Sequence, residues 1–111
     1  MARRRWRIRL SAAAERDFLG IVEWTAETYG IRQVRTYRRT LMLALAAVYQ
    51  GPDLPDSQPR DEIRPGLRSL HVARKGRRGR HFILYRTADS DLIEIVRILH
   101  DLMDISRHLP P

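Results

Sequence analysis

The run RDEIRPGLRSL, at residues 60–70, is the part of this chain in which the fold can first be read. Its Pro65-Gly66 dipeptide predicts a turn, and short stretches of β-type residues follow it. These stretches predict three strands, over about residues 67–74, 80–87 and 92–99. The second and third contain the runs FILY and IVRIL, which are apolar on both faces. Such strands need cover on both sides of their sheet.

Before this run, the sequence predicts one strand and two helices. Apolar residues alternate with arginine over residues 5–10, and a period of two is typical of a half-buried strand. Ser11 then has the residue type of a helix N-cap, and Gly30 that of a helix end. We expect a first helix up to Tyr29 and a second over about residues 31–49. Their short connection predicts an antiparallel hairpin.

Each helix has an apolar stripe at helical spacing, which we expect to face the sheet. The residues on these stripes are Ala14, Phe18, Ile21, Val22, Thr25 and Tyr29 in the first helix, and Val34, Leu41, Leu45 and Val48 in the second. Trp24 lies at the rim of the first stripe. It fits either a partly buried core residue or an anchor for a binding partner.

The segment from Gln50 to Gly66 is rich in proline, so we expect a surface loop there. The resulting order, β-α-α-β-β-β, predicts a single α+β domain over residues 1–111. A small antiparallel sheet would have the helical hairpin packed on one face, with the first strand at an edge or beside the last strands. Little of the chain is left to cover the second face, and an uncovered apolar face predicts a partner protein.

The formal net charge of +8 predicts an acidic partner. Of the 21 basic residues, 20 are arginine, because lysine occurs only at position 75. Nucleic acid, an acidic protein segment or anionic lipid would each fit this charge, as would a plain compositional bias. Arginine binds carboxylates in a bidentate manner, so it also suits protein interfaces. The turn at residues 74–80 has five positive charges in seven residues. It fits either a phosphate-binding finger or a solvated turn.

Composition also argues against several classes of protein. There is no cysteine, which excludes disulfides and thiolate metal sites. The four histidines lack the spacing of metal ligands, so we expect neither metal nor cofactor. The basic start of the chain has no apolar run behind it, which predicts neither an export signal nor a membrane span. We therefore expect a cytoplasmic protein with no membrane partner.

Candidates for catalysis are weak. No serine lies in the context of a nucleophile elbow. The best candidate for acid–base chemistry is His100, which follows Arg97 on the same strand end and precedes Asp101, Asp104 and His108. Such a cluster can position a phosphate and move a proton. A purely structural network of hydrogen bonds would look the same in sequence.

Taken in order, these elements resemble the ParE branch of the RelE/ParE toxin family, from bacterial type II toxin–antitoxin pairs. The resemblance extends over almost the entire chain and is most specific over residues 60–70 and 93–104. It implies a toxin for plasmid or chromosome stabilisation that inhibits DNA gyrase by binding, without catalysis. It also implies neutralisation in a hetero-oligomer with a ParD-type antitoxin. The implied antitoxin contacts are Trp24, Tyr29, Arg32, Arg35, Arg38 and Arg39, and the implied target contacts are Arg97, His100, Asp104 and His108.

Two other functions stay open from the sequence. The RelE branch of the family consists of ribosome-dependent mRNA endonucleases. For such an enzyme the catalytic candidates here are His81, Arg86, Arg97 and His100. The tail after His100 contains neither tyrosine nor lysine, which weakens this alternative. The third possibility is a non-toxic basic module that binds nucleic acid directly.

Overall fold

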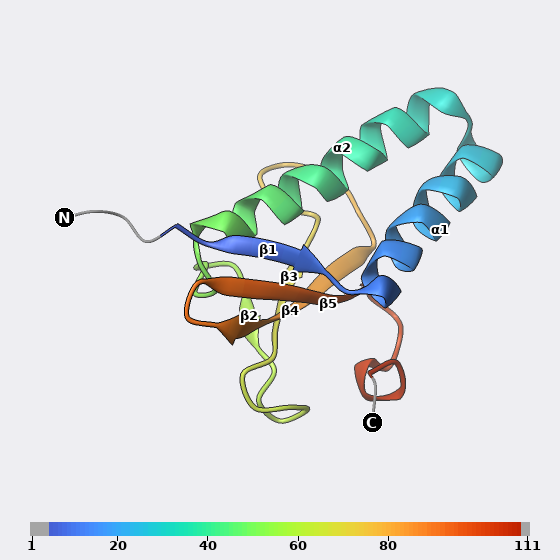
Figure 1. Ribbon diagram of the computed structural model, residues 1–111. Helices are drawn as coiled ribbons and strands as arrows, with labels where there is room; N and C mark the ends of the chain where they lie inside the picture. Colours follow the sequence, from blue (N-terminus) through green and yellow to red (C-terminus); the bar gives the residue numbers. More distant parts are fainter. Residues whose placement is uncertain (1–4, 110–111) are drawn as a thin grey trace.

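The computed structural model describes residues 5–109. A helical hairpin lies over one face of a five-stranded sheet, and loops and the C-terminal segment lie on the other side (Figure 1). Along the chain the elements are β1 (Arg7–Leu10), α1 (Ala12–Tyr29), α2 (Ile31–Ala47), the 3-10 helix η1 (Val48–Gln50), β2 (Gln58–Pro59), β3 (Arg68–His71), β4 (His81–Asp89), β5 (Leu92–His100) and the 3-10 helix η2 (Ile105–Arg107).

Local sequence explains where α1 begins and ends. Ser11 is its N-cap, because its Oγ accepts a hydrogen bond from the backbone N–H of Ala14 at 3.0 Å. The same hydroxyl donates to the carbonyl of Val96 at 2.8 Å, which ties the start of the helix to β5. Gly30 ends α1 with a φ of 89°, a value that glycine adopts readily. α2 begins at the next residue.

The strand order of the sheet is β1-β5-β4-β3-β2. The α+β class is confirmed, and so is the place of the first strand at an edge beside the last one. β1 runs parallel to β5, whereas the other neighbouring pairs are antiparallel, so the sheet is mixed rather than wholly antiparallel. A parallel pair needs a long connection, and the elements between β1 and β5 supply it. β2, from the proline-rich loop, is a two-residue edge strand, where proline is tolerated.

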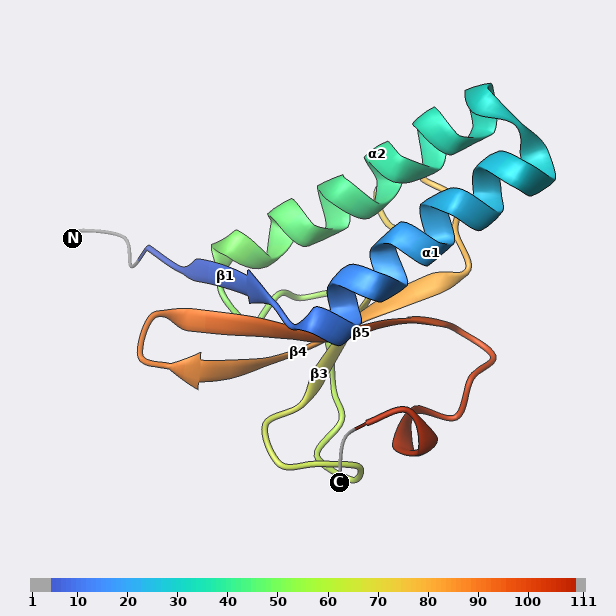
Figure 2. The same cartoon turned by 45° about the vertical axis from the view of Figure 1, so that its right-hand side comes forward.

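The larger core lies between the hairpin and the sheet. Buried Leu41 and Leu45 of α2 belong to the same cluster as Ile83 of β4 and Ile95 of β5, as the stripes predict. Tyr29 is an exception, with 61% of its surface exposed. It lies near the connection between the helices, which stands well away from the sheet (Figure 2).

The second face of the sheet is covered by the chain itself, so the prediction of an uncovered face is wrong. Phe82, Leu84 and Leu99 are buried in a smaller cluster with Leu67. Partly buried residues from the loop before β3 and from the C-terminal segment pack against this cluster, namely Ile63, Ile105 and Leu109. Periodicity does not reveal this cover, because these segments follow no regular pattern. Any surface for a partner must therefore be sought elsewhere.

No helix within residues 5–109 is long and apolar enough to cross a membrane. No group of three or more His, Cys, Asp or Glu residues is placed in this part of the chain to hold a metal ion.

Candidate protein-binding groove

An open groove of about 1660 Å³ runs between the helical hairpin and the turn at residues 73–80. α1 and α2 form one wall, and the turn at residues 73–80, which we call the basic turn, forms another. Residues from the ends of β4 and β5 and from the C-terminal segment complete the lining. The helical wall includes Ile21, Trp24, Tyr29, Gln33, Tyr37 and Thr40.

Two aromatic side chains stand exposed on the helical wall. Trp24 is 56% exposed, and its ring meets that of Tyr29 edge to face, with centroids 5.7 Å apart. Asp17, Gly20, Ile21 and Trp24 all line the groove, because residues three and four apart share one face of a helix. Trp24 is therefore not a core residue. Large exposed aromatic side chains of this kind are typical anchors for a protein partner.

The basic turn is held against α2. The backbone N–H of Arg80 donates a hydrogen bond to Oη of Tyr37 at 3.1 Å. Gly79 leaves no space, because a Cβ at this position would lie 2.5 Å from a methyl group of Val72 and 3.1 Å from the Tyr37 hydroxyl. The turn is therefore a positioned wall of the groove and not a freely solvated loop.

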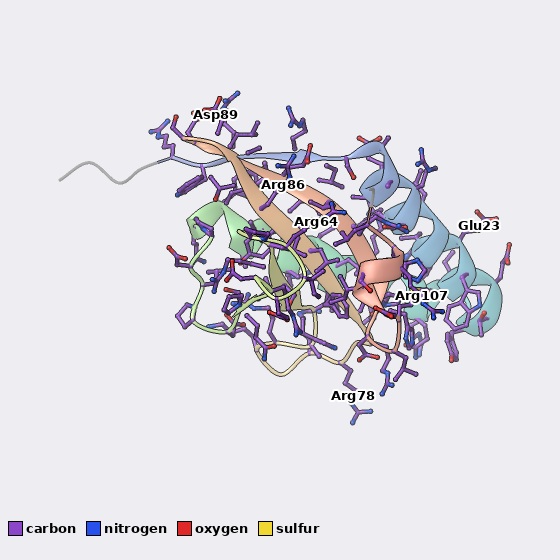
Figure 3. The ribbon with its side chains drawn as sticks, turned by 90° about the horizontal axis from the view of Figure 1, so that it is seen from below. Glu23, Arg64, Arg78, Arg86, Asp89 and Arg107 are labelled. Carbon is purple, nitrogen blue, oxygen red and sulfur yellow. The ribbon has the colours of Figure 1, made fainter. Side chains whose placement is uncertain are left out.

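The basic side chains of this turn have different surroundings. Arg74 forms an ion pair with Asp56, at 2.6 Å. Arg77 is half-buried and donates from Nη1 to Oγ1 of Thr40 at 3.2 Å. Arg78 belongs to the lining of the groove, but the end of its side chain points away from the body of the molecule (Figure 3). Only some of the charge in this turn is thus available inside the groove.

Histidine side chains lie at the end of the groove nearest the strands. Oη of Tyr37 is 2.6 Å from Nδ1 of His81. Because this oxygen already accepts the N–H of Arg80, its own proton is available for Nδ1. Burial, followed by the charge of nearby His100, lowers the pKa of His81 to about 4. His81 is therefore neutral at physiological pH, and burial raises the pKa of Tyr37 above its ordinary value.

Asp101 is an acidic residue that lies beside these histidine side chains. Its Oδ2 accepts a hydrogen bond from Nε2 of His71 at 3.0 Å, and its Oδ1 lies 3.4 Å from Nη2 of Arg80. The hydrogen bond from His71, helped by the charge of Arg80, holds the pKa of Asp101 below its ordinary value. The ionised carboxylate offsets part of the charge of Arg80, which leaves Arg77 as the less compensated arginine of the two.

The residues predicted to contact an antitoxin divide between two surfaces. Trp24 and Tyr29 line the groove. The arginines of α2 lie outside its lining, are exposed, and pair with no carboxylate within residues 5–109. These are Arg32, Arg35, Arg38 and Arg39.

The residues predicted to contact the target are also divided. Arg97, His100 and His108 line the groove. Arg97 is already engaged, through two hydrogen bonds of 2.7 and 2.8 Å to Asp17 and one of 2.7 Å to the His108 carbonyl. The hydrogen bonds that Arg97 donates to Asp17 raise the pKa of this guanidinium. Asp104 caps η2 instead, by accepting the N–H of Ser106 at 3.1 Å.

The four nuclease candidates do not converge on one point. The rings of His81 and His100 are in contact, with centroids 5.4 Å apart. Arg86 lies well away from Arg78, towards the end of the sheet at which Asp89 lies (Figure 3). It forms an ion pair with Glu94 at 3.0 Å.

Three important groove residues were not identified from the sequence. They are Asp17, Tyr37 and Thr40. A signal existed for the last two, because Gln33, Tyr37 and Thr40 recur at helical spacing beside the apolar stripe of α2. Nothing in the sequence indicates the role of Asp17, whose partners lie in β5.

Comparisons with known proteins agree with this fold. A family model described as the ParE toxin of the type II toxin–antitoxin system parDE matches residues 8–105. Over 100 residues the chain is 34% identical to Toxin ParE1 from two strains of Mycobacterium tuberculosis, covering 90% of this chain and 94% of the relative. Over 101 residues it is 29% identical to Toxin ParE1 of Caulobacter vibrioides, covering 91% and 95%. A solved structure described as the chromosomal ParDE TA system from P. aeruginosa matches with a TM-score of 0.70 and 17% identity, over 86% of this chain and 95% of that one.

Proposed function

The chain belongs to the ParE family of toxins from type II toxin–antitoxin systems, and on this premise we propose that it inhibits DNA gyrase by binding and is neutralised by a ParD-type antitoxin. The antitoxin would occupy the groove, and both encounters would take place in the cytoplasm. The observation that supports the antitoxin site is the pairing of two exposed aromatics, Trp24 and Tyr29, with a basic wall. A segment with one apolar side and one acidic side is complementary to both.

Binding without catalysis is supported by the state of the candidate catalytic groups. Arg97 is engaged with Asp17, and Arg86 is engaged with Glu94. A general acid or base must lie within hydrogen-bonding reach of the atoms that react, and these two arginines are not free to join His81 and His100 around one phosphate. We therefore propose that the protein is a stoichiometric inhibitor, so that the extent of gyrase inhibition follows the ratio of toxin to gyrase.

The test is a supercoiling assay with purified gyrase. Inhibition should depend on the ratio of toxin to gyrase and should be reversed by the purified antitoxin. The same toxin should leave mRNA intact on translating ribosomes. Codon-phased mRNA cuts that disappear in His100→Ala, with supercoiling unaffected, would favour the endonuclease. Salt-sensitive binding to naked duplex DNA, without effect on gyrase or ribosomes, would favour the nucleic-acid-binding module.

A further inference from the structure

Arg77 is a half-buried guanidinium that lacks a counter-charge. Within residues 5–109 it forms no ion pair, and its guanidinium donates a hydrogen bond to the neutral hydroxyl of Thr40. By contrast, a carboxylate lies within 4.0 Å of four other half-buried arginines, namely Arg60, Arg68, Arg74 and Arg97. Removing a charge from water without a partner is costly. A ligand with a negative charge would offset that cost at Arg77.

The surroundings of Arg77 set its position before any ligand arrives. Thr40 is buried, and its Oγ1 donates its single proton to the carbonyl of Thr36 at 3.1 Å. The same oxygen is therefore an acceptor for Nη1 of Arg77. The backbone of the turn is held two and three residues further on, by the tight packing of Gly79 and by the Arg80 N–H bond to Tyr37. A guanidinium has five N–H donors, so the others are left for a ligand.

The groove around Arg77 indicates the chemistry of this ligand. Its helical wall presents the apolar side chains of Ile21 and Trp24, and Met103 lines it as well. The carboxylate of Asp17 also lines the groove but is already paired with Arg97, and the apolar wall offers no partner to the many closely spaced phosphates of a nucleic acid. A single carboxylate on an otherwise apolar protein segment suits both the apolar wall and the one uncompensated arginine, and it matches the fork of a guanidinium.

We propose that Arg77 binds one carboxylate of the antitoxin and that this pair determines which acidic segment the groove accepts. This inference rests on the proposed function, since it assigns a specificity-determining contact within the antitoxin site. Arg77 differs in this respect from the exposed arginines of α2, because no neighbouring hydroxyl holds their side chains in a fixed orientation. Arg77 is presented by the basic turn, and Thr40 acts as its positioning residue.

Calorimetric titration with the purified cognate antitoxin tests the pair. Arg77→Ala should weaken binding by about 10- to 100-fold, as expected when one partner of a partly desolvated pair is lost. Arg77→Lys should recover only part of this loss, because an ammonium cannot form the bidentate contact. Thr40→Val keeps every charge and should still weaken binding by roughly 3- to 10-fold. Arg5→Ala, the control with the same change in net charge at an exposed residue, should stay within about twofold of the wild type.

The partner carboxylate is found by a double-mutant cycle. Each acidic residue of the antitoxin tail is replaced by its amide, and one of these changes should lose its effect in the Arg77→Ala background. If the wild type binds the antitoxin and Arg77→Ala binds it as well as Arg5→Ala does, the inference is overturned and the proposed function stands. Failure of the wild type to bind the antitoxin would overturn both. A larger effect of Arg77→Ala on binding to a 20-base-pair DNA duplex would identify a phosphate as the ligand and overturn the carboxylate.

Discussion

Asp17 accepts a hydrogen bond from the backbone N–H of Ile98 at 2.9 Å in addition to its two bonds from Arg97. One carboxylate on α1 therefore holds both the side chain and the backbone of β5. Arg97 in turn donates to the carbonyl of His108, which attaches the C-terminal segment. These contacts give Arg97 a structural role, whether or not the target also touches it.

Asp17→Asn is expected to destabilise the fold. The substitution leaves the guanidinium of Arg97 without its counter-charge, and the two side chains are only 22% and 15% exposed. We expect a loss of about 1–3 kcal/mol, below the values typical of fully buried pairs. Urea denaturation measures it. Arg9→Gln, which breaks a more exposed pair with Glu94, should cost less than about 1 kcal/mol. Unchanged stability combined with lost gyrase inhibition would place Arg97 in the target site instead.

Trp24→Ala is expected to weaken the complex with the antitoxin by about 2 kcal/mol, which is typical of a tryptophan anchor. The stability of the free variant protein should change little, because the ring of Trp24 is more than half exposed in the wild type. Leu19→Ala is the matched control, since Leu19 is an exposed apolar residue of the same helix outside the groove. Equal losses for the two substitutions, measured by calorimetry, would mean that the antitoxin does not lie in the groove.

His81 is expected to make stability depend on pH between about 4 and 6.5. Its pKa is lower in the folded protein than in the unfolded chain, so in this window the unfolded chain binds more protons. The stabilisation is complete above pH 6.5 and is lost as the pH falls towards 4. The full shift would correspond to about 3 kcal/mol, and we expect about half of this because the half-buried ring is screened by solvent.

His81→Asn isolates this effect, because its side-chain oxygen can still accept the Tyr37 hydroxyl but does not titrate. Thermal melts between pH 5 and 6.5 should show a clearly smaller slope for the variant than for the wild type. The lowered pKa values of Asp56, Glu94 and Asp101 add losses at lower pH, near the ordinary range of carboxylates. Equal slopes in the two proteins would show that His81 is not held neutral.

Gly79→Ala is expected to destabilise the protein by about 1–3 kcal/mol, because the added methyl would overlap buried Val72 and crowd Tyr37. Gly20→Ala is the control, since nothing lies within 4 Å of its added Cβ. That substitution should stabilise α1 by up to about 1 kcal/mol. Denaturant midpoints compare the two. A neutral Gly79→Ala would mean that the turn at residues 73–80 can move away from α2.

The exposed arginines of α2 are expected to contribute less to antitoxin binding than the groove does. Single alanine substitutions at Arg32, Arg35, Arg38 or Arg39 should each cost less than about 1 kcal/mol, as surface charges do. Replacing all four should mainly slow association and reduce its salt dependence. Stopped-flow measurements at two ionic strengths separate these effects. A single loss above about 2 kcal/mol would place an acidic part of the antitoxin on the outer face of α2.

Local patterns in the chain correctly predict β1, α1, α2 and the order of the later strands. Alternation with arginine, the Ser11 cap and the break at Gly30 act within a few residues, so they can be read directly. Pattern alone does not decide whether Trp24 is exposed. A rim residue is buried or exposed according to what stands opposite it, which is a property of the assembled molecule.

Contacts between distant segments decided how the candidate site is assembled. Three features depend on residues that are far apart in the chain. They are the parallel pairing of β1 with β5, the cover over Phe82 and Leu84, and the hydrogen bond between Tyr37 and His81. The charge of Arg77 is visible in the sequence, but its lack of a carboxylate partner is not. Whether an arginine is paired depends on which side chains the folded backbone brings within about 4 Å, and no local periodicity specifies that distance.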